Sequence, residues 1–213
     1  MSPTTATPCL PRVSPGRRRA LWSLGALLGA MGCMPAQEPT AGATASGSFN
    51  GLDVTGAAWG RDFNLLDAQG RTRTLADFRG QVVVLFFGFT QCPDVCPTAL
   101  SRAAAVMQQL GPAADRVQVI FVTVDPERDT APMLAAYTQA FHPRFLGLMA
   151  DLPTTERTAK DLKVFYRKVP TGSSYTMDHT ALSFVFDPAG RLRLAVRHET
   201  TAEQLAQDLK RLL

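Results

Sequence analysis

An unbroken apolar run, Val82–Phe87, leads directly into a segment that holds two cysteines, Cys92 and Cys96. Six consecutive apolar residues are typical of a strand buried on both faces of a sheet, because a half-exposed strand alternates apolar and polar residues. A helical pattern begins near Thr98, so the cysteines lie where a buried strand turns into a helix. The chain must therefore fold so that a rigid α/β scaffold presents a reactive loop.

The prolines of this segment refine the expected geometry. Cys96 precedes Pro97, and a residue before proline is pushed away from helical backbone angles, so we expect Cys96 just outside the helix. Pro97 suits the first helical position, where no N–H is needed. Both sulfurs should then lie near a helix N-terminus, whose partial positive charge favours thiolate over thiol. Such a pair can serve redox exchange, metal binding or both.

The first residues are typical of an export signal. Arg17–Arg19 precede an apolar stretch, residues 21–31, and Gly32-Cys33 resembles the cleavage site of a bacterial lipoprotein. We predict that residues 1–32 form a signal peptide and that Cys33 is lipidated. An uncleaved transmembrane anchor and plain secretion are the alternatives, although the stretch is shorter than the ~20 residues of a usual spanning helix. All three place the domain outside the cytoplasm, and we expect a membrane-anchored protein on the periplasmic side of a bacterial cell envelope.

Arginines of this leader account for the whole formal charge of +4. Arg12 and Arg17–Arg19 are four of the 22 basic residues, and residues 1–32 contain no Asp or Glu, so 18 basic and 18 acidic residues remain. The rest of the protein is formally neutral, which argues against nucleic-acid binding.

Export also changes the cysteine count. Cys9 would leave with the signal peptide and Cys33 would carry lipid, so Cys92 and Cys96 remain as the thiols of the mature protein. A disulfide can form between such thiols outside the cytoplasm. A purely structural disulfide is the plain alternative to a functional pair, although so short a loop contributes little closure entropy.

Residues 33–57 are rich in small and polar residues and predict a flexible tether, followed by one folded domain over residues 58–213. Within the domain, Val117–Val124 is a second apolar strand. A strand, a helix and a strand on this scale make a βαβ unit with parallel pairing and a right-handed crossover. Helices are expected over residues 131–141 and 155–165.

The end of the chain predicts a hairpin and a helix. Residues 181–186 and 192–196 are strands joined by Asp187–Gly190, whose proline and glycine match a type I turn. A capping box over Thr200–Glu203 opens the last helix. The order predicts an α/β, thioredoxin-like three-layer fold with a central mixed sheet, a C-terminal β-hairpin and a closing helix.

His179 is the best candidate for a third functional group. It precedes the C-terminal hairpin, in a loop that faces the cysteines of a thioredoxin-like fold. Two thiolates and an imidazole make a soft set that suits Cu(I) and also admits Cu(II) or zinc. Thioredoxin-like oxidoreductases carry a proline in this loop, and none occurs between Thr171 and Ser183. Metal binding is therefore better supported than dithiol exchange.

Two acidic residues near these groups have two interpretations each. Asp178 is either an outer partner that orients His179 or the cysteines, or a turn residue at the entry to the hairpin. Asp125 should lie near the site, because ligands sit beyond the carboxyl ends of strands. We interpret the segment Val124–Thr130 mainly as a turn and helix start.

Three blocks of the sequence together resemble the Sco/SenC family, the copper-binding assembly factors of cytochrome c oxidase. They are Thr90–Pro97, Val124–Thr130 and Met177–Thr180, and they occur in the family's order. Gln91 stands where the family often has His, and neither this nor the smaller differences in the third block removes a ligand.

The resemblance implies copper, as Cu(I) or Cu(II), held by Cys92, Cys96 and His179. It implies delivery of copper to the dinuclear copper centre of cytochrome c oxidase subunit II, or to another copper protein. A copper donor chaperone and a thiol reductant would be further partners. The alternative is a thiol-disulfide oxidoreductase, with Cys92 and Cys96 as its redox-active pair. A peroxide-reducing enzyme is a third, weaker hypothesis.

Overall fold

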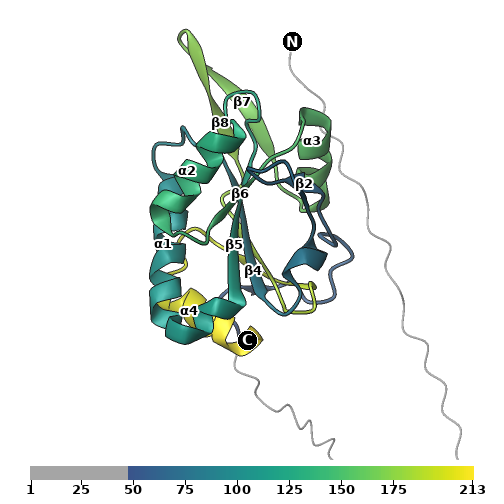
Figure 1. Cartoon of the computed structure of the whole chain (residues 1–213), viewed down its shortest axis with the longest axis vertical. Coiled ribbons are helices and arrows are strands. Elements are labelled where there is room, and N and C mark those ends of the chain that lie inside the picture. The colour runs from purple at the N-terminus through teal and green to yellow at the C-terminus, as the bar shows by residue number, and fades with distance from the viewer. Residues whose placement is uncertain (1–47) are drawn as a thin grey trace, which may run out of the picture. The chain divides into compact units, whose positions relative to one another are not determined.

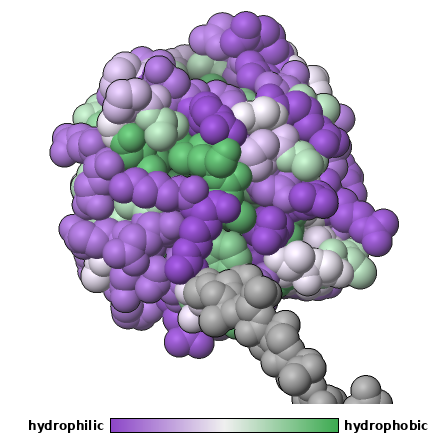
Figure 2. Space-filling view, turned by 90° about the horizontal axis from the view of Figure 1, so that it is seen from below, coloured by the Kyte–Doolittle hydropathy of each residue, from purple (hydrophilic) through white to green (hydrophobic). Residues whose placement is uncertain are grey.

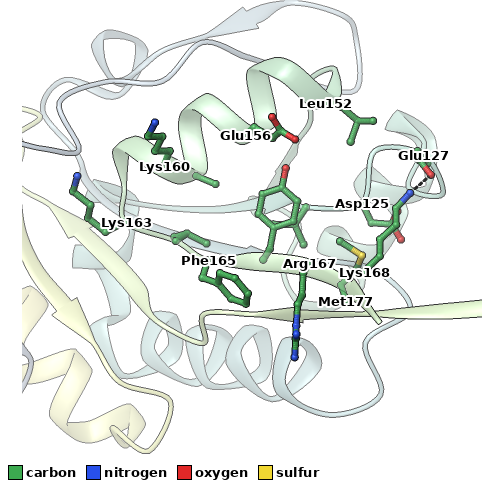
Figure 3. A pocket seen from close by; sticks show the side chains of 14 residues that line it. Asp125, Glu127, Leu152, Glu156, Lys160, Lys163, Phe165, Arg167, Lys168 and Met177 are labelled. Carbon is green, nitrogen blue, oxygen red and sulfur yellow. Dashed lines mark hydrogen bonds and ion pairs between the residues drawn. The ribbon is translucent and has the colours of Figure 1, made fainter. Parts of the chain in front are cut away.

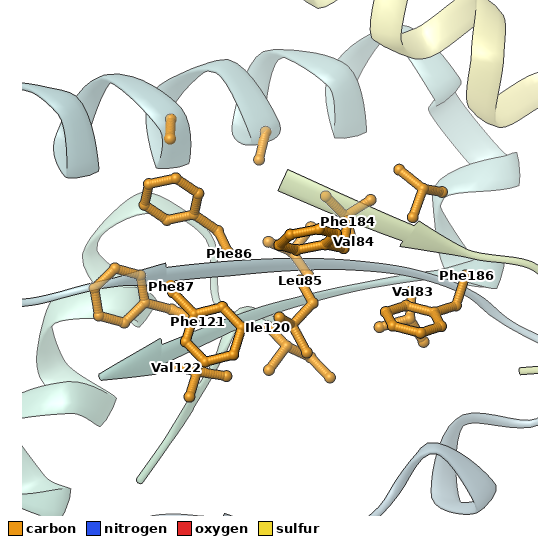
Figure 4. Packing of buried hydrophobic residues seen from close by; sticks show 14 of the residues in the cluster. Val83, Val84, Leu85, Phe86, Phe87, Ile120, Phe121, Val122, Phe184 and Phe186 are labelled. Carbon is orange, nitrogen blue, oxygen red and sulfur yellow. The ribbon is translucent and has the colours of Figure 1, made fainter. Parts of the chain in front are cut away.

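The central strand is β4 (Val82–Gly88), which is buried along its whole length. The structure is a computed structural model that describes residues 48–213; the predicted signal peptide, Cys33 and most of the predicted tether lie outside the described residues. In the six-stranded sheet, with the order β1-β10-β9-β4-β5-β6, β4 pairs in parallel with β5 (Val117–Thr123) and antiparallel with β9 (Ser183–Phe186). The sheet is therefore mixed, as predicted, and its phenylalanines and aliphatic residues form the core (Figure 4).

The other elements follow in chain order. The remaining strands are β1 (Leu52–Asp53), β2 (Leu65–Leu66), β3 (Thr72–Arg73), β6 (Leu146–Leu148), β7 (Tyr166–Thr171), β8 (Ser174–His179) and β10 (Leu192–Val196). The helices are η1 (Leu75–Phe78), α1 (Val95–Leu110), η2 (Gly111–Arg116), α2 (Ala131–Phe141), α3 (Leu152–Asp161) and α4 (Ala202–Leu212).

Helices cover both faces of the sheet. Figure 1 shows α1, α2 and α4 on one side of it, and α3 with the short hairpin β2–β3 on the other. These three layers, the C-terminal hairpin β9–β10 and the closing helix α4 confirm the predicted thioredoxin-like class. No helix within residues 48–213 is long and apolar enough to cross a membrane.

The helix after the cysteines begins earlier than predicted. Asp94 is its N-cap and Val95 its first residue, so Cys96 lies inside the first turn and Pro97 at the third helical position. Proline is tolerated there because the first N–H groups of a helix have no partner within the helix. The capping box of α4 is also shifted by one residue: Thr201 and Gln204 form it.

The folded domain begins before residue 58, which corrects the predicted end of the tether. β1 pairs with β10 at the edge of the sheet. Just before β1, the backbone N–H groups of Asn50 and Gly51 donate to the carboxylate of Asp208 on α4, at 2.9 and 2.8 Å. Asp208 is fully buried, so these bonds satisfy a carboxylate that would otherwise be costly.

One further correction bears on the site. The helix predicted over residues 155–165 ends at Asp161, and the segment before His179 is no simple loop. Strands β7 and β8 form a two-stranded antiparallel sheet of their own, with Tyr166 opposite His179. This hairpin extends from the body of the molecule (Figure 1). His179 lies at its base, at the end opposite the turn between Thr171 and Ser174.

Candidate metal centre

Three side chains meet at the carboxyl end of β4. The ligand atoms of Cys92, Cys96 and His179 all lie within 4.8 Å of one another, and His179 Nε2 is 3.6 Å from Cys96 Sγ. Cys96 is fully buried, whereas Cys92 and His179 are half-buried. No other group of three His, Cys, Asp or Glu residues within residues 48–213 has this geometry.

The cysteines are placed by the turn from strand to helix. Cys92 lies before the N-cap of α1, and the backbone N–H of Cys96 in its first turn points at Cys92 Sγ, at 3.5 Å. Gly88 ends β4 directly beneath the buried sulfur. A Cβ atom at Gly88 would come within 2.7 Å of Cys96 Sγ and of the ring of Phe121, so only glycine leaves room for the sulfur.

The ring of His179 is fixed in orientation and tautomer. The rings of Phe86 and Phe89 meet it edge-on, with centroids 5.9 and 6.0 Å away. Its Nδ1 lies 3.1 Å from the backbone oxygen of Thr180. A carbonyl oxygen only accepts hydrogen bonds, so Nδ1 carries the hydrogen and the lone pair of Nε2 faces Cys96. This is the arrangement of a histidine that ligates a metal.

The two thiols differ in acidity. The pKa of Cys92 is lowered to about 3, mainly because the Cys96 thiol donates to its sulfur, with the backbone N–H groups of Asp94 and Cys96 acting in the same direction against the effect of burial. The pKa of Cys96 is raised, because its hydrogen is held by Cys92 and because it is buried. The pair is thus a thiolate beside a thiol, and a bound metal ion would displace the remaining proton.

A buried carboxylate holds the cysteine loop to the sheet. Asp129 is 1% exposed and accepts hydrogen bonds from the backbone N–H and the hydroxyl of Thr90, at 3.1 and 2.5 Å. It also accepts one from the hydroxyl of Thr123 at the end of β5, at 2.6 Å. Every polar atom in this contact is paired, so the start of the loop is firmly attached.

Arg128 connects the cysteine loop with the hairpin that carries His179. Its guanidinium donates to Gln91 Oε1 at 3.2 Å, to the backbone oxygen of Tyr175 at 2.8 Å, and to the carboxylate of Asp125. It also stacks 3.7 Å from the centre of the Tyr175 ring. The Tyr175 hydroxyl in turn donates to Asp125 at 2.9 Å. We call Asp125, Arg128 and Tyr175 the brace.

The brace matters because the hairpin has little other support. A cavity of about 740 Å³ separates the hairpin from α3, with Met177 and Asp125 among its lining residues (Figure 3). The ion pair between Lys168 and Glu127 crosses the edge of this cavity. Acidic and basic side chains line the cavity, whereas Cys92, Cys96 and His179 do not.

Asp178 does not play the part expected of an outer partner. Side chains alternate along β8, so Tyr175, Met177 and His179 face the body of the molecule while Asp178 faces away. Its carboxylate is 52% exposed and pairs with Arg167 at 3.2 Å. The backbone of Thr180, and not Asp178, therefore orients the histidine.

The remaining site predictions have mixed outcomes. Asp125 lies near the site as expected, and the segment after it does form a turn before α2, but its role in the brace was missed. Gly88 and Tyr175 were also missed. The position of residues 125–129 beyond a strand end pointed towards the brace, whereas nothing local marked Tyr175 as its partner.

Comparison with known proteins agrees with this geometry. The family model SCO1/SenC matches residues 53–213. A bovine protein, the mitochondrial SCO2 homolog of Bos taurus, is 41% identical over 154 residues, which are 70% of this chain. The chain covers 58% of that relative's length.

Solved structures give the same result. The structure of Bradyrhizobium japonicum ScoI with copper bound is 41% identical, with a TM-score of 0.68, and the match covers 73% of this chain and all of that one. The apo Sco1 protein of Thermus thermophilus is 41% identical, with a TM-score of 0.71, over 78% of this chain and 98% of that one. The strand–helix junction, the histidine facing it and the family match over nearly the whole described domain lead to one conclusion: the chain belongs to the SCO1/SenC family.

Proposed function

We propose that this protein is a copper metallochaperone that assists assembly of the dinuclear copper centre in cytochrome c oxidase. The observation that carries the proposal is the convergence of two sulfurs and one imidazole nitrogen within 4.8 Å. Soft thiolates with one imidazole suit Cu(I), and the set also accepts Cu(II). Copper is here the cargo of the protein, and the copper-bound ScoI structure of a relative supports the assignment.

The geometry suits transient binding. Three ligands leave copper with an open side, and Cys92 and His179 are only half-buried, so ligands of a target protein can reach the metal. Subunit II of the oxidase, or another copper protein, is the proposed acceptor. A copper donor chaperone and a thiol reductant would supply metal and electrons.

Copper titration of the reduced full chain in detergent tests the proposal. We expect one equivalent of Cu(I) to bind, and the substitutions Cys92→Ala, Cys96→Ala and His179→Ala each to weaken binding by about tenfold or more, as loss of one ligand requires. His198→Ala is the matched control, because His198 follows β10 and lies outside the site. Unchanged copper affinity in His179→Ala would refute the three-ligand site.

A thiol-disulfide oxidoreductase is the second candidate function. It is favoured by the lowered pKa of Cys92 beside a protonated Cys96, since a thiolate is the attacking species in disulfide exchange. The two functions exclude each other at any moment, because a Cys92–Cys96 disulfide leaves no thiolate for copper. His179 separates them: His179→Ala should weaken copper binding by about tenfold or more while the Cys92–Cys96 disulfide still forms.

We further propose where the protein works. The apolar stretch of residues 21–31 and the Gly32-Cys33 pair support cleavage before Cys33, lipidation of that cysteine and a tether that leads to the domain. The protein would then be held at a membrane, on the periplasmic side of a bacterial envelope. Mass spectrometry of the mature N-terminus tests this: a diacylated Cys33 is expected, and an intact N-terminus would favour a membrane-spanning anchor.

A further inference from the structure

A second cavity lies at the opposite end of the sheet from the metal centre. Its volume is about 590 Å³, and it is bordered by residues 55–61, by Arg79 and by the β9–β10 turn with the start of β10. The backbone N–H of Gly80 donates to Pro188 in this turn, which places the cavity beside the amino end of β4. The metal centre lies beyond the carboxyl end, so roughly 20 Å of strand separates the two.

Four arginines from three separate parts of the chain line this cavity, and no acidic residue does. They are Arg61, Arg79, Arg191 and Arg193. Two carboxylates act on these arginines: Asp187, which is 3% exposed, pairs with Arg191 at 2.8 Å and with Arg193 at 3.5 Å, and Asp53 attracts Arg193. The cluster therefore keeps an excess of positive charge.

Arg61 and Arg79 are less engaged with carboxylates than Arg191 and Arg193. Arg79 donates to the backbone oxygen of Ala189, in the β9–β10 turn, and forms no ion pair with a carboxylate of residues 48–213. Arg61 is exposed, and no carboxylate within residues 48–213 forms an ion pair with it. Like charges gathered at one cavity repel each other, and an anion between them would remove that repulsion.

The chemistry of the lining indicates what the anion is. Guanidinium groups present paired N–H donors that match the oxygens of a phosphate, and several arginines around one anion is the usual way in which proteins hold phosphate. Trp59 and Leu192 add an apolar wall. We propose that this cavity binds a phosphate group.

Two sources of phosphate fit the site, a free phosphate ion and the headgroup of an anionic phospholipid. The cavity is lined from Thr55 onward, only seven residues after the first described residue, Ser48. Seen from below, the side on which the described chain begins, the visible surface is largely hydrophilic around one hydrophobic band (Figure 2). A headgroup held here would turn the metal centre away from the membrane, towards a partner.

Trp59 supplies a direct probe. The full chain has two tryptophans, and Trp22 lies in the proposed signal peptide, so Trp22→Phe leaves Trp59 as the one tryptophan whether or not that peptide is cleaved. Inorganic phosphate should change its fluorescence in a saturable way, and isothermal titration should give the same affinity. The double substitution Arg61→Gln/Arg79→Gln should weaken binding by about tenfold or more, since each lost arginine removes a charge-assisted hydrogen bond.

Matched controls distinguish phosphate binding at this cavity from general electrostatic attraction of phosphate to the protein. Arg167→Gln removes one positive charge at the other end of the molecule, and it should leave phosphate affinity unchanged. Copper binding by the double variant should equal that of the wild type, which shows that the fold is intact and keeps this test separate from the copper proposal. The absence of saturable phosphate binding by both methods, or equal affinity in the double variant and the wild type, would overturn the proposal.

Vesicles distinguish the two sources. The full chain is inserted into vesicles of phosphatidylcholine alone or with phosphatidylglycerol. If headgroups fill the site, they compete with free phosphate, so phosphatidylglycerol should raise the phosphate concentration needed for half-saturation of the wild type. In the double variant, phosphatidylglycerol should have no such effect. If the phosphate concentration at half-saturation of the wild type is the same in both kinds of vesicle, the site binds a free phosphate ion.

Discussion

Two cysteines four positions apart, one in the loop after β4 and one in the first turn of α1, have opposite properties. Cys92 is half-buried and receives hydrogen bonds, whereas Cys96 is fully buried and donates its hydrogen to Cys92. The Cys92 thiolate can therefore react with a metal ion or a disulfide at neutral pH. The Cys96 thiol stays protonated and buried until a metal ion or disulfide reacts with Cys92. The difference comes from local contacts, since the residue type is the same.

The acidity of Cys92 predicts an unusual pH profile for alkylation. A pKa lowered from 9.0 to about 3 means that the thiolate, and the stability it gives the folded chain, persist as the pH falls from 9.0 and are lost as it passes through about 3. Iodoacetamide should modify Cys92 at nearly the same rate at about pH 5 and about pH 8. The alkylation rate of an ordinary thiol would rise by on the order of a hundredfold or more over the same pH range. Peptide mass mapping of the reduced protein measures this. A rate that climbs steeply over that range would contradict the assignment, and Cys96 should remain unmodified.

Gly88 predicts a coupling between packing and metal affinity. Gly88→Ala would place a methyl group within 2.7 Å of Cys96 Sγ, so we expect a loss of about 1–3 kcal/mol in the free energy of unfolding, together with weaker copper binding. Gly147→Ala is a matched control, because its methyl group would press on Leu134, at 2.9 Å, far from either sulfur. It should lose stability but keep copper affinity. Denaturant unfolding and copper titration of both variants give the comparison.

At the scale of elements, the buried strands could be predicted from the sequence, and the exposed hairpin could not. β4 and β5 were predicted because strands covered on both faces must be apolar throughout, so Val82–Phe87 has few other interpretations. Hairpin β7–β8 was missed because half of its strand residues are exposed and only Met177 is buried, so the alternation that marks a half-buried strand is weak in it. The metal ligands were predictable from residue type and from the family resemblance. The brace was not, because its contact between Arg128 and Tyr175 depends on the hairpin's exact placement.

The brace predicts an effect of Arg128 on copper binding without contact to the metal. Arg128→Gln would release the hairpin from the cysteine loop, so His179 would be held less well, and we expect copper affinity to fall by about 10–100-fold, as for other groups that orient ligands. Arg128→Lys keeps the charge but cannot reach Gln91, Asp125 and Tyr175 together, so it should restore only part of the loss.

A control for this experiment is Arg144→Gln. Arg144 pairs with Asp115 at 2.9 Å and lies outside the site, so its loss should leave copper affinity unchanged. The thiolate-to-copper absorption band adds a readout that a general loss of stability would not move. An unchanged band and affinity in Arg128→Gln would show that the hairpin holds His179 without the brace.

At the scale of the whole molecule, the metal centre exists only in the folded state. The cysteine loop follows β4, Asp125 and Arg128 of the brace follow β5, and His179 comes from β8, so the sheet must form before the three ligands can meet. Copper binding is therefore linked to folding, and the bound metal should stabilise the whole domain.

This linkage predicts a redox-dependent thermal shift. Cu(I) at a thousandfold excess over its dissociation constant would stabilise the reduced protein by about 4 kcal/mol, which for a domain of this size raises the melting temperature by roughly 10 °C. The oxidised protein should show no such shift, since its sulfurs are joined to each other, and reduced His179→Ala should show a smaller one. Differential scanning calorimetry with and without Cu(I) measures all three. An equal shift in the oxidised protein would mean that copper binds without the cysteine thiolates, and the metal centre would have to be sought elsewhere in the chain.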